Sequence, residues 1–248
     1  MRKEGKDGIE WCDYTQNPII GCKRGCPYCY AKKLNDRFRF VKDFSVPEER
    51  LSGFETVKTK RSVSIFFDSM SDFEFWSHDQ TDEFLGLVFA SSDTVQWVGL
   101  SKSPKAIADL RAWADRSVFG ERLWLGYSCG SDELARKAVA EALNGLMADF
   151  LSIEPLSCDL ASSKAFSDVV SKAPRLQAAI IGAETGNRKG KTVCEKGWVS
   201  SLSDALTKAG KAVFMKKSVK ELMGDGYRQD ALPWPCDATR RSVRPDDD

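Results

Sequence analysis

The sequence lacks the features of an exported, membrane-bound or strongly charged protein. No run is long and apolar enough to span a bilayer, and the N-terminus, Met-Arg-Lys-Glu-Gly-Lys-Asp, is too polar for a signal peptide. Lys and Arg number 37 against 36 Asp and Glu, so the bulk charge does not indicate a nucleic-acid partner. These absences predict a cytoplasmic protein with no membrane partner.

Histidine is almost absent, whereas cysteine is common. The chain has one histidine, His78, and eight cysteines, which in an unexported protein favour metal ligands or free thiols over disulfides. Cys22, Cys26 and Cys29 lie in the run Gly-Cys-Lys-Arg-Gly-Cys-Pro-Tyr-Cys-Tyr-Ala, with gaps of three and two residues. Gly and Pro in this run favour a loop that turns its side chains inward.

Three closely spaced cysteines suit an iron–sulfur cluster with an open site. A cubane cluster held by three thiolates keeps one iron free for a small molecule, whereas four thiolates give a closed electron carrier. A disulfide and a zinc site are the alternatives, because Cys26-Pro-Tyr-Cys29 is also half of a zinc ribbon. Since the chain has no second Cys-x-x-Cys pair, the spacing favours a 4Fe–4S cluster.

Short apolar runs alternate with helical patterns along the chain. Most of the runs are continuous, as expected for strands buried on both faces, and the alternation predicts an α/β fold with a parallel sheet or barrel. The strand candidates are Pro18–Gly21, Val63–Phe67, Thr94–Leu100, Leu123–Tyr127, Phe150–Ile153, Ala178–Gly182 and Ala212–Met215. The helix candidates are Tyr30–Phe38, Asp79–Ala90, Pro104–Ala114, Ser131–Leu146 and Trp198–Ala209.

The predicted organisation is one large domain with an insert and a tail. The domain covers residues 1–223, and its charged, irregular insert near residues 41–61 is expected at the surface. The tail, residues 224–248, is expected to be extended and disordered at its end. A cover over the mouth of the barrel and a simple linker are both compatible with this composition.

The cysteine motif resembles that of the radical SAM superfamily, whose signature is Cys22-x-x-x-Cys26-x-Tyr28-Cys29 in this chain. Most of the chain also resembles a small, phage-associated radical SAM family of unassigned function, and more distantly spore photoproduct lyase. The segments that carry this resemblance are Ile9–Trp11, Asp68–Asp72, Leu123–Ser128, Leu151–Leu156, Ile180–Gly186 and Phe214–Lys216.

The resemblance implies a fold, two cofactors and a reaction. The fold is a partial (β/α) barrel of six or seven parallel strands, and Cys22, Cys26 and Cys29 hold the 4Fe–4S cluster. Its reduction cleaves S-adenosylmethionine to a 5′-deoxyadenosyl radical, which abstracts hydrogen from a substrate. The implied partner is an electron donor such as flavodoxin or ferredoxin, and a phage-encoded protein would work in the host cytoplasm.

Polar residues that follow the predicted strands are the candidate cofactor contacts, because ligands bind at the carboxyl ends of parallel strands. The hydroxyls and carboxylate of Ser69, Ser71 and Asp72 suit the ammonium group of S-adenosylmethionine, although Ser71 and Asp72 also suit a helix cap. The resemblance adds Tyr28 beside the cluster, Ser128 and Glu154 near the ribose and methionine, and Gly182 against adenine. Glu154 is equally suited to pair with a nearby cation.

One thiol and several basic residues are candidates for work on the substrate. Cys129 follows a strand and has an S–H bond weak enough to return hydrogen to a carbon radical, although a small buried turn residue fits equally well. A predicted basic rim gathers at the strand ends and consists of Lys102, Arg188, Lys189, Lys191, Lys216 and Lys217. Solvated loop charges are the alternative.

The basic rim and the phage association favour a nucleic-acid substrate: a base, a modified nucleotide or a DNA lesion. A small phosphorylated metabolite or a peptide would fit the same charges. From a different class, the chain fits a non-catalytic nucleic-acid-binding module stabilised by zinc or by a cluster. Anaerobic iron and sulfide analysis separates these classes.

Overall fold

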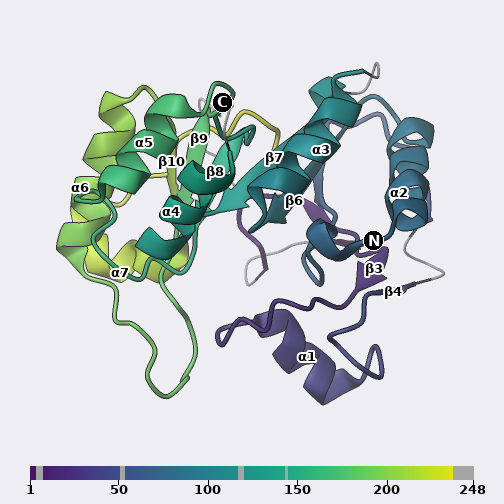
Figure 1. The fold of residues 1–248 in the computed structure, drawn as a ribbon, viewed down its shortest axis with the longest axis horizontal. Coiled ribbons are helices and arrows are strands. Elements are labelled where there is room, and N and C mark those ends of the chain that lie inside the picture. The colour runs from purple at the N-terminus through teal and green to yellow at the C-terminus, as the bar shows by residue number, and fades with distance from the viewer. Residues whose placement is uncertain (4–7, 51–53, 117–119, 143–144, 237–248) are drawn as a thin grey trace, which may run out of the picture. The chain divides into compact units, whose positions relative to one another are not determined.

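The computed structural model describes residues 1–3, 8–50, 54–116, 120–142 and 145–236, which form two compact units (Figure 1). Unit 1 comprises Met1–Leu100, Trp113–Trp124 and Trp234–Arg241. Unit 2 comprises Ser101–Ala112, Leu125–Pro233 and Ser242–Asp248.

The strands confirm the α/β class with a mostly parallel sheet. They are β1 (Arg2–Lys3), β2 (Tyr14–Thr15), β3 (Ile19–Ile20), β4 (Glu48–Glu49), β5 (Val63–Phe66), β6 (Val95–Ser101), β7 (Leu123–Ser128), β8 (Phe150–Ile153), β9 (Ala178–Ile181) and β10 (Ala212–Met215). Eight of them form a sheet in the order β1-β2-β5-β6-β7-β8-β9-β10. The β1–β2 pair is antiparallel, whereas β2–β5, β5–β6, β7–β8, β8–β9 and β9–β10 are parallel. The partial barrel stays a prediction.

Several of the helices begin at a residue whose side chain caps the first turn. They are α1 (Tyr30–Phe38), α2 (His78–Ala90), α3 (Pro104–Ala114), α4 (Asp132–Glu141), α5 (Lys164–Lys172), α6 (Lys196–Lys208) and α7 (Lys220–Met223). Ser77 caps α2 and Ser131 caps α4, each accepting a bond from a backbone N–H of the first turn. Among the described residues, no helix has the length and apolar content needed to cross a bilayer.

The first strand of the large sheet in unit 1 differs from the sequence prediction. The run Pro18–Gly21 was expected to be a parallel strand, but its centre, β3, pairs antiparallel with β4 in a separate two-stranded sheet. The place beside β5 is taken by β2. Asp13 anchors β2, because its N–H donates to Ser64 O at 3.1 Å and its carboxylate accepts from Ser64 N at 3.0 Å. Two polar residues such as Tyr14–Thr15 give no apolar run to detect.

Residues of the predicted insert and tail contribute to the core of unit 1. Val41 and Phe44 are buried in a cluster with Ile20, Ala31 and Met70, so part of the segment 41–61 is packed. Figure 1 shows α1 on the same side of unit 1 as β3 and β4. In the tail, Trp234 is 1% exposed and donates to Trp11 O at 2.7 Å. The predicted disordered end, residues 242–248, lies outside the described residues.

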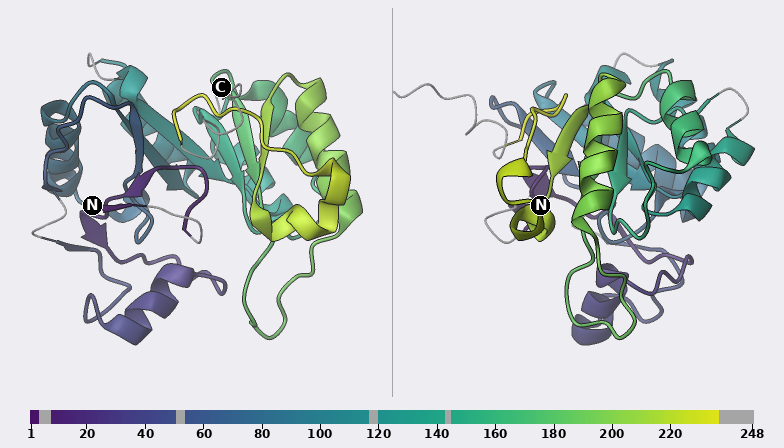
Figure 2. Two further views of the ribbon diagram at one scale, coloured as in Figure 1. Left: turned by 180° about the vertical axis from the view of Figure 1, so that it is seen from behind. Right: turned by 90° about the vertical axis from the view of Figure 1, so that its left-hand side faces the viewer.

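Unit 2 is organised around a buried ion pair. Arg111 of α3 pairs with Asp149, and both side chains are 1% exposed. Asp149 also accepts bonds from Leu125 N at 2.8 Å and Arg175 Nε at 2.9 Å. A charge that is taken out of water needs such partners, because its desolvation costs several kcal/mol. Figure 2 shows the long loop between β9 and α6 extending away from the helices of this unit.

Candidate metal and cofactor site

The three-cysteine loop follows β3 in unit 1, and backbone bonds fix both of its ends. Gly21 has φ +122°, and a Cβ there would lie 2.5 Å from Val46 O, so only glycine fits. Gly21 N donates to Met70 O at 3.1 Å and Cys22 N donates to Phe44 O at 2.7 Å. Cys29 caps α1, since its Sγ accepts from Lys32 N at 3.4 Å. Gly21 thus sets the start of the loop, and the N-cap of α1 at Cys29 sets its end.

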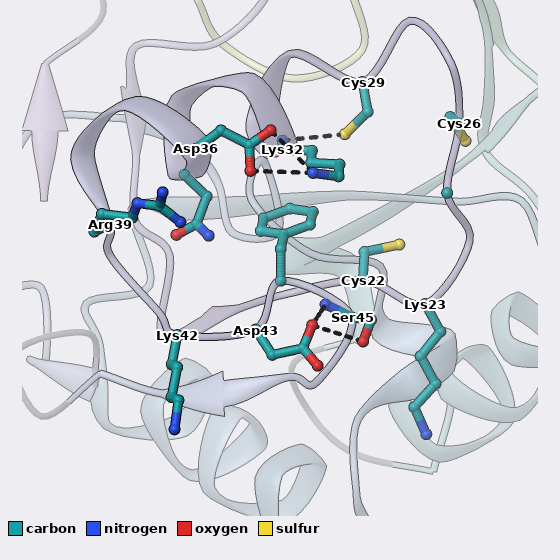
Figure 3. A pocket seen from close by; sticks show the side chains of 13 residues that line it. Cys22, Lys23, Cys26, Cys29, Lys32, Asp36, Arg39, Lys42, Asp43 and Ser45 are labelled. Atoms are coloured by element: carbon teal, nitrogen blue, oxygen red, sulfur yellow. Dashed lines mark hydrogen bonds and ion pairs between the residues drawn. The ribbon is translucent and has the colours of Figure 1, made fainter.

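The three thiols face a common cavity. Cys22, Cys26 and Cys29 are half-buried, form no disulfide and line a cavity of about 710 Å³. Figure 3 shows the three side chains around one open space, with the Cys29 sulfur turned toward Lys32. Among the described residues, no three Cys, His, Asp or Glu side chains are placed to hold a single metal ion.

Burial raises the pKa of two side chains of the cysteine loop, Cys22 and Tyr28. Burial raises the pKa of the Cys22 thiol to about 11, while the Arg24 backbone opposes the shift. Burial also raises the pKa of Tyr28 to about 12, with further contributions from Cys26 and Cys29. Tyr28 is therefore close to Cys26, and its role beside a cluster stays a prediction.

The structure brings the predicted ammonium-binding residues next to the cysteine loop. Arg24 of that loop forms ion pairs with Asp72, at 3.2 Å, and with Glu74. Its guanidinium group also lies over the Phe75 ring. Tyr30 Oη donates to Ser69 O at 2.6 Å, a second link between the two segments. The first two strand-end segments that the sequence singled out thus form one region of unit 1.

Each of these polar residues also has a structural partner. Asp72 caps the short 3-10 helix η2 (Phe73–Phe75) by accepting from Glu74 N at 3.1 Å, so the capping interpretation is confirmed. Ser71 Oγ accepts from Trp76 Nε1 at 3.1 Å, and Ser69 Oγ donates to Asn17 Oδ1 at 3.0 Å. A carboxylate or hydroxyl oxygen accepts more than one bond, so capping leaves the ammonium role open as a prediction.

The other predicted cofactor residues lie together in unit 2. Glu154 pairs with Lys216, as the cation-pairing alternative anticipated. A Cβ at Gly182 would meet the Glu154 side chain at 3.2 Å, so this glycine makes room for a carboxylate. Ser128, at the end of β7, is buried. The nucleotide-binding roles of Ser128, Glu154 and Gly182 stay predictions.

Cys129 is buried in the turn after β7. Its N–H donates to Ser152 O at 2.8 Å, and burial raises the pKa of its thiol to about 12. The next residue, Gly130, packs so closely that a Cβ there would lie 2.2 Å from Pro155 O. Cys129 therefore keeps its S–H bond at neutral pH, which a hydrogen donor needs and which a buried turn residue shares.

The predicted basic rim is partly neutralised within unit 2. Arg188 donates to both oxygens of Glu184 at 2.6 and 2.8 Å, and Lys216 is held by Glu154. Lys191 Nζ donates to Gly186 O at 2.8 Å. Lys102 follows β6, Lys189 is exposed, and Lys217 begins the short helix η4 (Lys217–Val219). At least two of the six cations, Arg188 and Lys216, are thus already paired with carboxylates.

The sequence analysis missed a group of residues beside the cysteines. Arg39 and Lys42 line the same cavity as the three thiols (Figure 3). The detectable signal was the alternation of basic and aromatic residues in Arg37-Phe38-Arg39-Phe40, which follows the cysteine motif in the sequence.

The fold and the site define an α/β protein with a half-buried three-cysteine loop beside a cavity. The chain belongs to the family described as "Protein of unknown function (DUF5131)", whose model matches residues 6–226. A search of the curated proteins finds no match. The family description carries no activity, so the function has to be argued from the site.

Proposed function

We propose that this protein is a radical SAM enzyme in which Cys22, Cys26 and Cys29 ligate a 4Fe–4S cluster. The observation that carries the proposal is that three thiols of one short loop face one cavity of about 710 Å³ (Figure 3). We also propose that the substrate is a nucleic-acid base, and that S-adenosylmethionine is the second cofactor. The resemblance of the motif to the superfamily signature supports both cofactors.

The donor set fits a cluster better than a single zinc ion. A structural zinc site has four ligands, and the loop supplies three thiols and no histidine. A 4Fe–4S cluster held by three thiolates matches this number of cysteines and keeps one iron open. When bound, the cluster and S-adenosylmethionine supply a 5′-deoxyadenosyl radical that abstracts hydrogen from the substrate.

The protein's own residues have positioning roles in this proposal. Arg24 fixes the cysteine loop against Asp72, so the thiols and the proposed ammonium acceptors keep a set spacing. The hydrogen bond from Cys22 N to Phe44 O closes one wall of the cavity, and the buried Phe44 ring excludes water there. A rigid, partly dry wall is what a reactive intermediate requires.

The test is anaerobic reconstitution with iron and sulfide, followed by iron analysis, visible absorbance and S-adenosylmethionine cleavage. Alanine at Cys22 or Cys26 is expected to remove the chromophore and the cleavage together. Cys29→Ser is the sharper variant at the third position, because serine keeps the cap of α1 while removing the sulfur. Cys158→Ala and Cys194→Ala are controls that retain both signals.

Two outcomes contradict the proposal. A chromophore that survives removal of all three cysteines places the iron elsewhere. Stoichiometric zinc with no visible absorbance supports the alternative of a non-catalytic, zinc-stabilised nucleic-acid-binding module.

A further inference from the structure

Two phenylalanine side chains are exposed side by side at the end of α1. Phe38 is 53% exposed and Phe40 is 45% exposed, and their ring centroids lie 5.7 Å apart with an interplanar angle of 36°. Single exposed apolar residues are common on protein surfaces. A neighbouring pair of tilted rings, in contrast, presents a continuous aromatic surface to a ligand.

The backbone holds this pair in place. Helix α1 ends at Phe38, and Arg39 takes a left-handed conformation with φ 56°, where its N–H donates to Asn35 O at 2.7 Å. The buried Asn35 side chain accepts from Val41 N at 2.9 Å and donates to Val41 O at 3.1 Å. These bonds fix the turn on both sides of Phe40, so the two rings are oriented before any ligand arrives.

The residue at the left-handed end of α1 is an arginine, Arg39. Glycine is the usual residue at a left-handed helix end, because other residues pay a steric penalty there. Arg39 is the one non-glycine residue with positive φ in the described part of the chain. The Arg39 side chain lines the cysteine cavity together with that of Lys42. It therefore places a positive charge there, which glycine could not do.

Positive charge surrounds the two rings. Arg37 lies over the Phe38 ring at 4.9 Å and Arg50 over the Phe40 ring at 5.9 Å. Within the described residues, Arg37, Arg39, Lys42 and Arg50 make no ion pair. Residues 21–50 contain eight Lys or Arg against four Asp or Glu, a net charge of +4, whereas the whole chain has +1. The field is therefore local to this segment.

We propose that this surface binds single-stranded nucleic acid. We call it the Phe38–Phe40 platform, and it consists of Phe38, Phe40, Arg37, Arg39, Lys42 and Arg50. Aromatic faces combined with cations are the means by which proteins hold single strands, since bases stack on the rings and phosphates meet the charges. Bases inside a duplex are stacked on each other and offer no free face to the rings.

The platform rests on the proposed function, because it would hold the nucleic acid whose base the proposed enzyme modifies. Arg39 and Lys42 belong both to the platform and to the lining of the cysteine cavity. A strand held on the rings therefore has neighbouring nucleotides at the edge of that cavity. This places the nucleic-acid contacts in unit 1, and not on the basic rim expected from the sequence.

The test is fluorescence anisotropy of the reconstituted protein with labelled oligo-dT, oligo-rU and duplex DNA over a salt series. Phe38→Ala combined with Phe40→Ala is expected to weaken single-strand binding about tenfold or more, with the salt slope unchanged. Arg37→Gln combined with Arg50→Gln is expected to flatten the log–log salt slope by about 1.4. The dT and rU arms show whether DNA or RNA is preferred.

Matched controls separate the platform from general surface effects. Phe89→Ala removes a 64% exposed aromatic ring of α2 in the same unit, and Arg136→Gln removes an exposed arginine of unit 2. Both are expected to keep wild-type binding, with thermal unfolding as the check that each variant folds. Tighter binding of duplex than of single strands, or equal losses in variant and control, overturns the platform.

The design also distinguishes failure of the platform from failure of the proposed function. Protein with Cys22→Ala lacks the proposed cluster ligand, yet its platform residues are unchanged. Ring-dependent binding in that variant supports the platform whatever the iron analysis shows. A wild-type protein that binds the cluster but no nucleic acid at low salt overturns the platform and leaves the radical SAM assignment standing.

Discussion

Charged side chains serve different purposes in residues 21–50 of unit 1 and at the strand ends of unit 2. At the strand ends, Glu154 pairs with Lys216 and Glu184 pairs with Arg188, so both cations are neutralised by carboxylates of the protein itself. In residues 21–50, Arg24 and Lys32 are also paired with carboxylates, but Arg39 and Lys42 line a cavity instead. The difference teaches that a basic residue indicates a ligand only when the protein itself does not use its charge.

The largest expected effect is on the stability of unit 2, whose charges are paired within the protein. Asp149→Ala leaves Arg111 buried without its main partner, which should cost about 3–5 kcal/mol in the free energy of unfolding. Denaturant unfolding followed by circular dichroism measures it. Asp168→Ala, which removes one partner of an exposed pair with Lys164, is the control and should leave stability nearly unchanged. Equal stability of the two variants would contradict the buried-pair argument.

The next effect concerns Asp72, which both caps η2 and is proposed to bind an ammonium group. Asp72→Asn keeps an oxygen that caps as well as aspartate but removes the charge. A charged hydrogen bond is worth about 1.5–3 kcal/mol, so S-adenosylmethionine should bind about tenfold or more weakly while the iron content stays the same. Titration calorimetry measures the affinity. Unchanged affinity would leave the cap of η2 and the ion pair with Arg24 as the roles of this carboxylate.

A smaller effect is expected from the half-buried pair at the strand ends of unit 2. In a double-mutant cycle with Glu154→Gln and Lys216→Met, the coupling should be up to about 1 kcal/mol, because the pair is partly screened by water. Thermal and denaturant unfolding give the four stabilities. Coupling near zero would show that Lys216 is free to meet a ligand, and would restore it to the basic rim.

The smallest effect is expected on the loop between β9 and α6. Lys189→Ala combined with Lys191→Ala should change single-strand affinity by less than about twofold, because the Phe38–Phe40 platform is proposed to carry the contacts. The anisotropy assay described above measures it. A large loss here, with intact binding in the phenylalanine variant, would reverse the comparison between the two regions.

Much of the framework was predictable because it depends on local patterns. The continuous apolar runs of β5, β8 and β9 are buried throughout, and the start of α3 at Pro104 followed from proline at a helix start. The strand β2 was missed because two residues with polar groups carry no periodic signal. Its position depends on Asp13 and Ser64, which are 51 residues apart in sequence.

The sequence by itself determined the α/β class, the parallel strands and the spacing of Cys22, Cys26 and Cys29, because these depend on neighbouring residues. Only the tertiary structure decided which charges are used internally. The partner of Glu154 is 62 residues away, and no local pattern predicts such a pair. The exposure of Phe38 and Phe40 was also decided by folding, because α1 ends at Phe38 and the bonds between Asn35 and Val41 hold the turn that carries Phe40.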